Sequence, residues 1–246
     1  MCTVSWFTTE NGYELFFNRD ESKQRTEALA PEKFSGSAAN FLSPTDVQGG
    51  GSWVASNQFG LTVCLLNLYT DIDLVESEHY LSRGKIIRDI AGFVSLREVY
   101  QHVAQYDLSM FRTFRVFAID SSGKNILIAW NGIELTLEND VVAPKSSSSV
   151  DTQKVVSGRK KLFTELGLKD SHERDDFFAY QRGHEPNKNY SVCVHREFTQ
   201  TVSLSHIVVD QDNVIFDYYN GSPCESFEPV SQKITRTSID SQVDVA

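Results

Sequence analysis

The sequence predicts an α+β fold in which two antiparallel sheets stack face to face and helices cover their outer sides. Two observations carry this prediction. Strand-like runs occupy both ends of the chain, and helical spacing of apolar residues is concentrated in residues 77–106 and 154–181. Strands that follow one another through short turns favour antiparallel pairing, and helices then pack their apolar sides on the sheets.

A chain of 246 residues, 40% of them hydrophobic, is long enough to bury one substantial core. We expect a single domain over residues 1–225 and a polar C-terminal tail over residues 226–246.

The N-terminal part is predicted to open with a β-hairpin, because Glu10-Asn11-Gly12 is a strong turn signal between two strand-like runs. Residues 22–48 are polar and contain two prolines, and we expect a long loop there. The glycines at 49–51 predict a turn into the next strand; they lack the lysine and the following helix of a phosphate-binding loop. The strands expected in this half cover residues 3–7, 12–18, 54–57 and 60–68.

Residues 77–106 are predicted as two helices that separate near Gly92. Ser95 is expected to cap the second helix, and Glu98 three residues later completes a capping box. His102 on this helix is expected to be a surface histidine rather than a metal ligand.

The second half of the chain returns to strands. Residues 144–152 contain four consecutive serines and are predicted as a flexible loop, and residues 154–181 are predicted as mostly helical. The strands expected here cover residues 114–119, 125–130, 133–137, 190–195, 201–209 and 214–219.

Charge and cysteine content exclude several function classes. The 23 basic and 33 acidic residues give a formal net charge of -10, and no basic cluster follows a phosphate backbone, so we expect no nucleic-acid partner. The four cysteines and the histidines lack metal-binding spacing, so we expect no metal and no cofactor. No signal peptide or membrane-spanning segment is apparent, which favours a reduced, cytoplasmic protein.

Cys2 is the most informative single residue. Methionine is generally removed when the second residue is small, and loss of Met1 would leave Cys2 with a free α-amine beside its thiol. A thiol titrates near about 8.5 and an α-amine near about 7.7–8.0, so the amine can take the thiol proton close to neutral pH. The alternative is a core residue that starts a strand, since most free cysteines pack as small hydrophobic residues.

The tetrapeptide Asn18-Arg19-Asp20-Glu21 is a second unusual feature. Four polar residues stand where the second strand of the hairpin should still be apolar, and the hairpin brings this end beside Cys2. Such departures from pattern tend to mark functional sites, although a solvated strand end gives the same pattern.

These residues resemble the NRDE family, also called the transport and Golgi organisation protein family, over residues 1 to about 220. The segments that carry the resemblance are Met1-Cys2, Gly12 to Phe17 with the tetrapeptide that follows, Gly50-Gly51-Ser52-Trp53, Asn57, Gly60, Leu65-Leu66-Asn67, Ser82-Arg83-Gly84 and, more loosely, residues 191–196.

That family is similar to the N-terminal-nucleophile hydrolases with a cysteine nucleophile, such as bile-salt hydrolase and penicillin V acylase. Those enzymes have a four-layer αββα fold and hydrolyse non-peptide amide bonds. The resemblance therefore implies an αββα sandwich and an amidohydrolase that cleaves a small-molecule amide through a thioester on Cys2.

The resemblance also implies individual roles. Cys2 would be the nucleophile and Asn67 an oxyanion donor; Arg19 would lower the thiol pKa, and Asp20 or Glu21 would orient the amine. Adjacent strand residues point to opposite faces, so Arg19 and Asp20 face Cys2 together only if the strand bends there. A different alignment offers Asn18 and Glu21 instead. Arg196 is implied as a late catalytic arginine, and the substrate-binding residues are implied to be Asn18, Trp53 and Asn57.

The second oxyanion asparagine of those hydrolases has no counterpart, because the serine run around Ser147 occupies its place. This gap leaves two other functions open. One is a ligand-binding or trafficking protein that holds a lipid-like or haem-like molecule, with Cys2 as a contact. The other is a structural domain without a small-molecule site.

Overall fold

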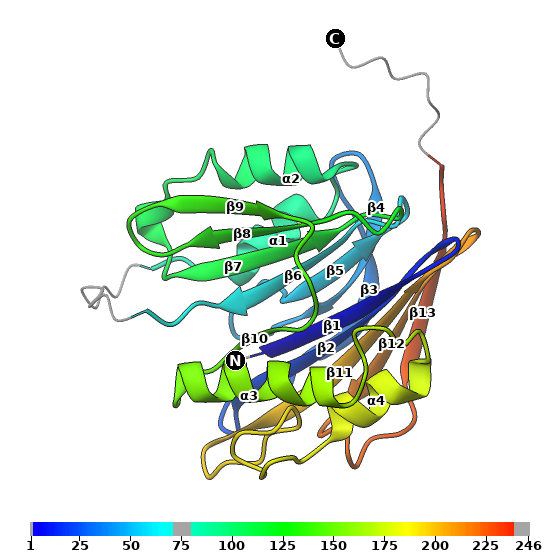
Figure 1. Ribbon diagram of the computed structural model, residues 1–246. Coiled ribbons are helices and arrows are strands. Elements are labelled where there is room, and N and C mark those ends of the chain that lie inside the picture. The colour runs from blue at the N-terminus through cyan, green and yellow to red at the C-terminus, as the bar shows by residue number, and fades with distance from the viewer. Residues whose placement is uncertain (1, 71–79, 239–246) are drawn as a thin grey trace.

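Two antiparallel sheets stack at the centre of the protein, and a pair of helices covers the outer face of each (Figure 1). The computed structural model describes residues 2–70 and 80–238. Its four layers are the αββα sandwich predicted from the sequence.

The first sheet has the strand order β10-β1-β2-β11-β12-β13. The predicted hairpin is confirmed: β1 and β2 pair antiparallel, with Glu10 and Asn11 in the turn. Its strands are β1 (Cys2–Thr9), β2 (Gly12–Ser22), β10 (Lys145–Ser147), β11 (Thr199–Val209), β12 (Asn213–Asn220) and β13 (Val230–Thr235).

The second sheet runs in sequence order from β3 to β9, so each strand pairs with the next one along the chain. The strands predicted over residues 114–119, 125–130 and 133–137 correspond to its last three strands. Its strands are β3 (Leu29–Ser35), β4 (Asn40–Thr45), β5 (Val54–Asn57), β6 (Thr62–Asn67), β7 (Phe114–Ile119), β8 (Asn125–Trp130) and β9 (Leu135–Asn139).

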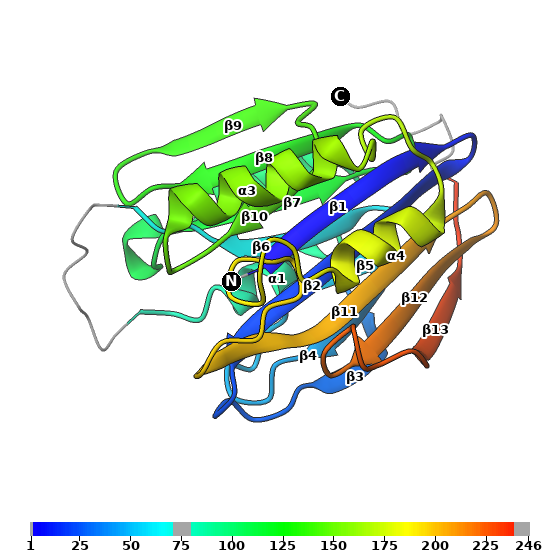
Figure 2. The ribbon, with the colours of Figure 1, turned by 60° about the horizontal axis from the view of Figure 1, so that its bottom comes forward.

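Helices α1 (Gly84–Ile90) and α2 (Leu96–Val103) cover the second sheet. The predicted cap of α2 is confirmed, because Ser95 Oγ accepts from the Glu98 backbone N–H and the Glu98 carboxylate accepts from Val94 N–H. Helices α3 (Thr152–Glu165) and α4 (Arg174–Arg182) cover the first sheet, with α4 over β2 and α3 along β10 (Figure 2). A short 3₁₀ turn, Leu108–Met110, follows α2.

Three apolar clusters hold these layers together. One lies between the sheets and includes Val4, Leu15 and Phe117. A second joins α1 and α2 to the second sheet through side chains such as Ile87. The third joins α3 and α4 to the first sheet and is largely aromatic, with Phe16 against Phe177. Burial of apolar surface on both sides of each sheet accounts for the four-layer arrangement.

Four strands fall where the sequence predicted loop or tail. β3 and β4 lie within residues 22–48, β10 within residues 144–152 and β13 within residues 226–246, so the folded part extends beyond residue 225. Three of them, β3, β10 and β13, are edge strands, which have a pairing partner on one side only. Edge strands tolerate polar residues, so their sequences lack the apolar pattern used for prediction.

The strand predicted over residues 190–195 is wrong. Val192, Cys193 and Val194 are buried, but in a turning segment with one isolated bridge, His195 to Gln200. A short apolar run does not distinguish a strand from a buried loop. The start of the predicted helical region, residues 77–79, lies outside the described residues.

Within residues 2–70 and 80–238, no helix combines the length and the hydrophobicity needed to cross a bilayer.

Candidate active site

A cavity of about 350 Å³ opens where the ends of β1, β2 and β6 meet the start of α1. It is mostly polar, and charged residues of both signs border it. Its lining residues from the predicted site are Cys2, Arg19, Asp20, Glu21, Trp53 and Asn67. These six residues, which the family resemblance implied as site residues, therefore lie around one cavity.

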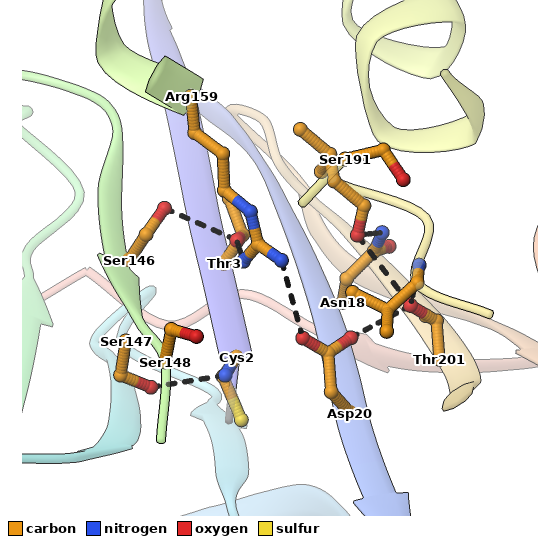
Figure 3. A network of polar contacts seen from close by, with 12 residues as sticks. Cys2, Thr3, Asn18, Asp20, Ser146, Ser147, Ser148, Arg159, Ser191 and Thr201 are labelled. Carbon is orange, nitrogen blue, oxygen red and sulfur yellow. Dashed lines mark hydrogen bonds and ion pairs between the residues drawn. The ribbon is translucent and has the colours of Figure 1, made fainter. Parts of the chain in front are cut away.

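Cys2 begins β1 and lies between two paired strands. It is opposite Arg19 of β2 on one side and Ser147 of β10 on the other. Its backbone N–H donates a hydrogen bond to Ser147 Oγ at 3.0 Å (Figure 3). The residue is only 7% exposed, so its sulfur reaches the cavity from within the inter-sheet core.

Opposing influences act on the Cys2 thiol. Burial raises the pKa of the thiol above its usual value, and the Asp20 carboxylate raises it further. The Arg19 guanidinium and the backbone N–H of Asp20 lower the pKa, because both stabilise a thiolate. The net direction is upward.

Arg19 shares the face of Cys2, because directly opposite residues of an antiparallel pair point to the same side. Its guanidinium lies over the Trp53 ring at 4.2 Å from the centroid, close to Glu21 at 3.4 Å and Asp46 at 3.7 Å. Arg19 and Glu21 are therefore the residues of the tetrapeptide whose side chains meet on the cavity side.

Asp20 projects to the opposite face of β2. Its Oδ1 accepts a hydrogen bond from Thr201 Oγ1 at 2.6 Å, and its Oδ2 lies 3.7 Å from the Arg159 guanidinium (Figure 3). The pairing of β2 with β11 shifts register between Thr201 and Ser203, which lie opposite Asp20 and Arg19. The extra residue lies in β11, and β2 keeps its normal alternation: Arg19 faces the cavity with Cys2, whereas Asp20 faces Thr201 and Arg159.

Arg159 of α3 was missed by the sequence analysis. It is 2% exposed, and it donates to Thr3 Oγ1 at 2.7 Å and to the Tyr190 carbonyl at 3.3 Å. A signal was present in the sequence: Arg159 is flanked at four-residue spacing by Val155 and Phe163, which are buried on the same helix face. An arginine in the middle of an apolar helical stripe indicates a buried partner.

Asn67 ends β6, where its side chain borders the same cavity as Cys2. Its Nδ2 donates to the Tyr69 hydroxyl at 3.1 Å. A side-chain amide on the cavity wall is suited to donate a hydrogen bond to a substrate oxygen.

Three predicted site residues lie away from the cavity lining. Asn18 is buried and donates to the Gln181 and Val192 carbonyls, which ties β2 to α4 and the segment after it. Asn57 is buried, and its side chain bonds four backbone groups, which fixes the connection around β5. Arg196 donates to the Asn189 carbonyl and to Ser148 Oγ.

A group of possible metal ligands lies outside this cavity. His184, Cys193, His195 and Cys224 each place one ligand atom within 4.8 Å of the others. The sequence shows no metal-binding spacing because these residues come from separated segments that only the fold brings together.

The sequence profile of the family described as Transport and Golgi organisation 2 matches residues 1–232. The chain belongs to this family. The match covers both sheets except the last residues of β13, and it includes Cys2, the tetrapeptide at 18–21 and Asn67. The sequence matches none of the curated proteins.

Solved structures of hydrolases share the fold of this family member. The C2A mutant of conjugated bile acid hydrolase from Clostridium perfringens has a TM-score of 0.57 and 14% identity, covering 96% of this chain and 97% of that chain. The Caenorhabditis elegans ortholog of N-acylethanolamine-hydrolyzing acid amidase has a TM-score of 0.62 and 10% identity, covering 85% and 92%. Penicillin V acylase from Agrobacterium tumefaciens has a TM-score of 0.53 and 13% identity, covering 95% and 86%. At these identities the likeness establishes the N-terminal-nucleophile hydrolase fold alone.

Proposed function

We propose that the protein is an amidohydrolase that cleaves a non-peptide C–N bond of a small molecule through a thioester on Cys2. The observation that carries the proposal is the position of Cys2: its side chain borders a polar cavity directly opposite Arg19, and its backbone nitrogen lies 3.0 Å from Ser147 Oγ. The hydrolases named above share this fold, which supports the same reaction class.

The first half of the proposed reaction forms the thioester. Once Met1 has been removed, the α-amine of Cys2 takes the thiol proton, and the sulfur attacks the substrate carbonyl carbon. The carbonyl oxygen becomes an oxyanion that accepts a hydrogen bond from the Asn67 side chain. The C–N bond then breaks, and the leaving nitrogen takes the proton from the ammonium group.

The second half returns the enzyme to its starting state. The free α-amine takes a proton from water, and the hydroxide attacks the thioester carbonyl. The carboxylic acid leaves and the thiolate regains its proton from the ammonium group. Throughout, Ser147 Oγ would hold the nitrogen in place by accepting its hydrogen bond.

Arg19 would favour the thiolate by its charge and is itself held over Trp53. Asp20 would act behind the nucleophile, since its backbone N–H lowers the thiol pKa and its carboxylate is fixed by Thr201 and Arg159. Asn18 and Asn57 are left out of the proposed substrate contacts, because both lie outside the cavity lining and their side-chain NH2 groups already donate to backbone carbonyls.

The test is release of p-nitroaniline from a panel of N-acyl-p-nitroanilides with short to long acyl groups. The wild-type protein is expected to hydrolyse at least one of them, and Cys2→Ala is expected to fall to the uncatalysed rate. Asn67→Ala is expected to lower kcat about 100- to 1,000-fold, the usual loss for one oxyanion donor.

Cys64→Ala is the matched control. Cys64 is a buried thiol of β6 within the same inter-sheet cluster as Cys2, but it does not border the cavity. It should keep its activity. Equal turnover by wild type and Cys2→Ala would refute the proposal.

One observation favours a binding protein as the second candidate. Burial raises the pKa of the Cys2 thiol, which opposes thiolate formation and suits a contact with a bound ligand at the cavity wall. A binding protein would retain its ligand in the cavity of the Cys2→Ala variant and would leave the nitroanilide panel intact.

A further inference from the structure

We propose that His184, Cys193, His195 and Cys224 bind one Zn²⁺ ion in a closed tetrahedral site. The site would tie the segment after α4 to the connection between β12 and β13. It is separate from the cavity that Cys2 borders and does not depend on the proposed hydrolysis.

The distances fit a tetrahedron. His195 Nε2 lies 3.4 Å from Cys193 Sγ and 3.3 Å from Cys224 Sγ, and all four ligand atoms lie within 4.8 Å of one another. Zinc bonds of about 2.3 Å to sulfur and about 2.0–2.1 Å to nitrogen give edges of about 3.3–3.8 Å. Two edges already have this length, and the other pairs of ligand atoms lie within 4.8 Å of one another, so small side-chain movements would close the site.

His184 has the atom that such a site needs. Its Nε2 is buried and has no hydrogen-bond partner within the described part of the chain. Its ring packs edge-on to that of His195, with 5.1 Å between the centroids. Buried polar atoms are normally paired, so an orphaned imidazole nitrogen among two thiols and a second imidazole points to a missing ligand.

The backbone holds the ligands at this place. The Cys193 N–H donates to the Gly183 carbonyl at 3.2 Å, and the His195 N–H donates to the Lys188 carbonyl at 2.8 Å. These bonds fold the segment back on itself, so residues that are separated in sequence converge. A site whose ligands are already positioned loses less conformational freedom when the ion binds.

The donor set favours zinc. Two sulfurs and two imidazole nitrogens in tetrahedral array are typical of Zn²⁺. The ion displaces one proton from each thiol, so two protons leave and two thiolates balance its two positive charges. Four protein ligands leave no open position for water or substrate, so the site is structural rather than catalytic.

A disulfide between Cys193 and Cys224 is the competing chemistry. Both cysteines are free thiols in this structure. The nitrogen of His195 lies within 3.4 Å of both sulfurs, an arrangement that a metal uses and a disulfide does not require.

The proposed ion would stabilise a segment that supports the candidate active site. Val194 N–H, between two of the ligands, donates to Thr201 Oγ1, and that hydroxyl donates to the Asp20 carboxylate. Val192 in the same segment accepts from Asn18. Fixing residues 193–195 thus fixes the groups behind β2.

The test is metal binding by the purified full chain, reduced and handled without oxygen. Titration with Zn²⁺ against a chromophoric chelator should give one ion per chain, with a dissociation constant below about 100 nM. Co²⁺ should give the visible absorption of a tetrahedral ion together with a thiolate-to-cobalt charge-transfer band. Zn²⁺ should raise the melting temperature.

Cys224→Ser and His184→Gln are the test variants, because both positions are partly exposed and the changes are small. Each should weaken Zn²⁺ binding at least about 100-fold, since even outer-shell partners are worth 10–100-fold. Each should also lose the zinc-dependent rise in melting temperature. Circular dichroism establishes that the variants are folded.

Cys2→Ala and Cys64→Ala are the controls and should keep one tight zinc per chain. Three results would overturn the proposal: no binding tighter than 10 µM, undiminished binding by both test variants, or loss of binding on Cys2→Ala alone. A Cys193–Cys224 disulfide with no zinc uptake after reduction would also overturn it.

Discussion

The side chain of Arg159 shows how one buried residue organises the candidate site. It reaches from α3 to Thr3 beside the nucleophile and to Asp20 behind it, on the face of the first sheet that the helix covers. Both Arg159 and Asp20 are almost fully buried, so each charge depends on the groups around it. The pair therefore couples the helix layer to the end of β1.

Replacing Arg159 with leucine should destabilise the protein by about 3–5 kcal/mol, because it removes one partner of a buried ion pair. Arg159→Lys should recover part of this loss, since it keeps the charge without the planar fork. Equilibrium unfolding in urea measures both.

Lys161→Ala is the control on the same helix. Lys161 pairs with Glu165 at 3.5 Å in an exposed position, and its loss should change stability by less than about 0.5 kcal/mol. A stability of Arg159→Leu equal to that of the wild type would contradict the anchoring role.

At the scale of the elements, the connection between β4 and β5 depends on a close backbone approach. A Cβ added at Gly51 would lie 2.3 Å from the Gly84 carbonyl carbon at the start of α1. Ser52 N–H donates to the Gly84 carbonyl at 3.0 Å, so the two backbones are in direct contact. This contact positions the start of α1, which forms part of the cavity wall.

Gly51→Ala should therefore destabilise the protein by about 1–3 kcal/mol, the usual cost of forcing an extra carbon into a packed place. Gly158→Ala is the opposite case: it lies in α3 with nothing within 4 Å of the added Cβ, and it should stabilise by about 0.5–1 kcal/mol. Thermal unfolding of both variants and the wild type measures the two changes in stability. A loss of stability in Gly158→Ala as large as that in Gly51→Ala would contradict it.

The elements that could be predicted from sequence are those with two buried faces or a strong cap. β6 and β7 have apolar runs, and α2 has its Ser95 and Glu98 cap. The missed edge strands have no such signal, since one open side tolerates polar residues. β10 is three residues long and rich in serine, yet it positions Ser147 against the Cys2 nitrogen.

The candidate site was predictable where a motif carries it. Cys2, the tetrapeptide and Asn67 stand in family motifs, and all but Asn18 line one cavity. Ser147, Arg159 and the ligands around His195 are brought in by tertiary packing from α3, β10 and two loops. No local pattern of residues encodes that convergence, apart from the interrupted apolar stripe at Arg159.

At the scale of the whole molecule, stability at low pH depends on the ion pairs between the helix layer and the first sheet. Glu14 of β2 bonds His206 of β11 at 2.8 Å and the Arg174 guanidinium of α4 at 2.7 Å. Burial raises the pKa of Glu14, but the hydrogen bonds from His206 and Arg174 outweigh it and lower the pKa to about 2. The unfolded chain has a glutamate pKa of about 4.3.

Above about pH 4.3 the Glu14 carboxyl is ionised in both the folded and the unfolded state, so its contribution to stability is complete. As the pH falls from about 4.3 to 2, the unfolded state binds a proton that the folded state does not, and the contribution is lost. Glu14→Gln should therefore show a shallower fall in unfolding free energy over this range than the wild type.

Urea unfolding at a series of pH values measures that slope. Glu165→Gln, an exposed carboxylate on α3, should reproduce the wild-type slope. Identical slopes for Glu14→Gln and the wild type would show that the Glu14 cluster does not fasten the layers.

The most direct test of the central claim is the mass of the chain trapped during turnover. The protein is mixed with an activated acyl ester, quenched in acid within its first turnover and digested for peptide mapping. The account predicts a chain that begins at Cys2 and carries one acyl group on that sulfur, removable by hydroxylamine and absent in Cys2→Ala. Acylation that persists in Cys2→Ala, or a turning-over protein that retains Met1, would contradict it.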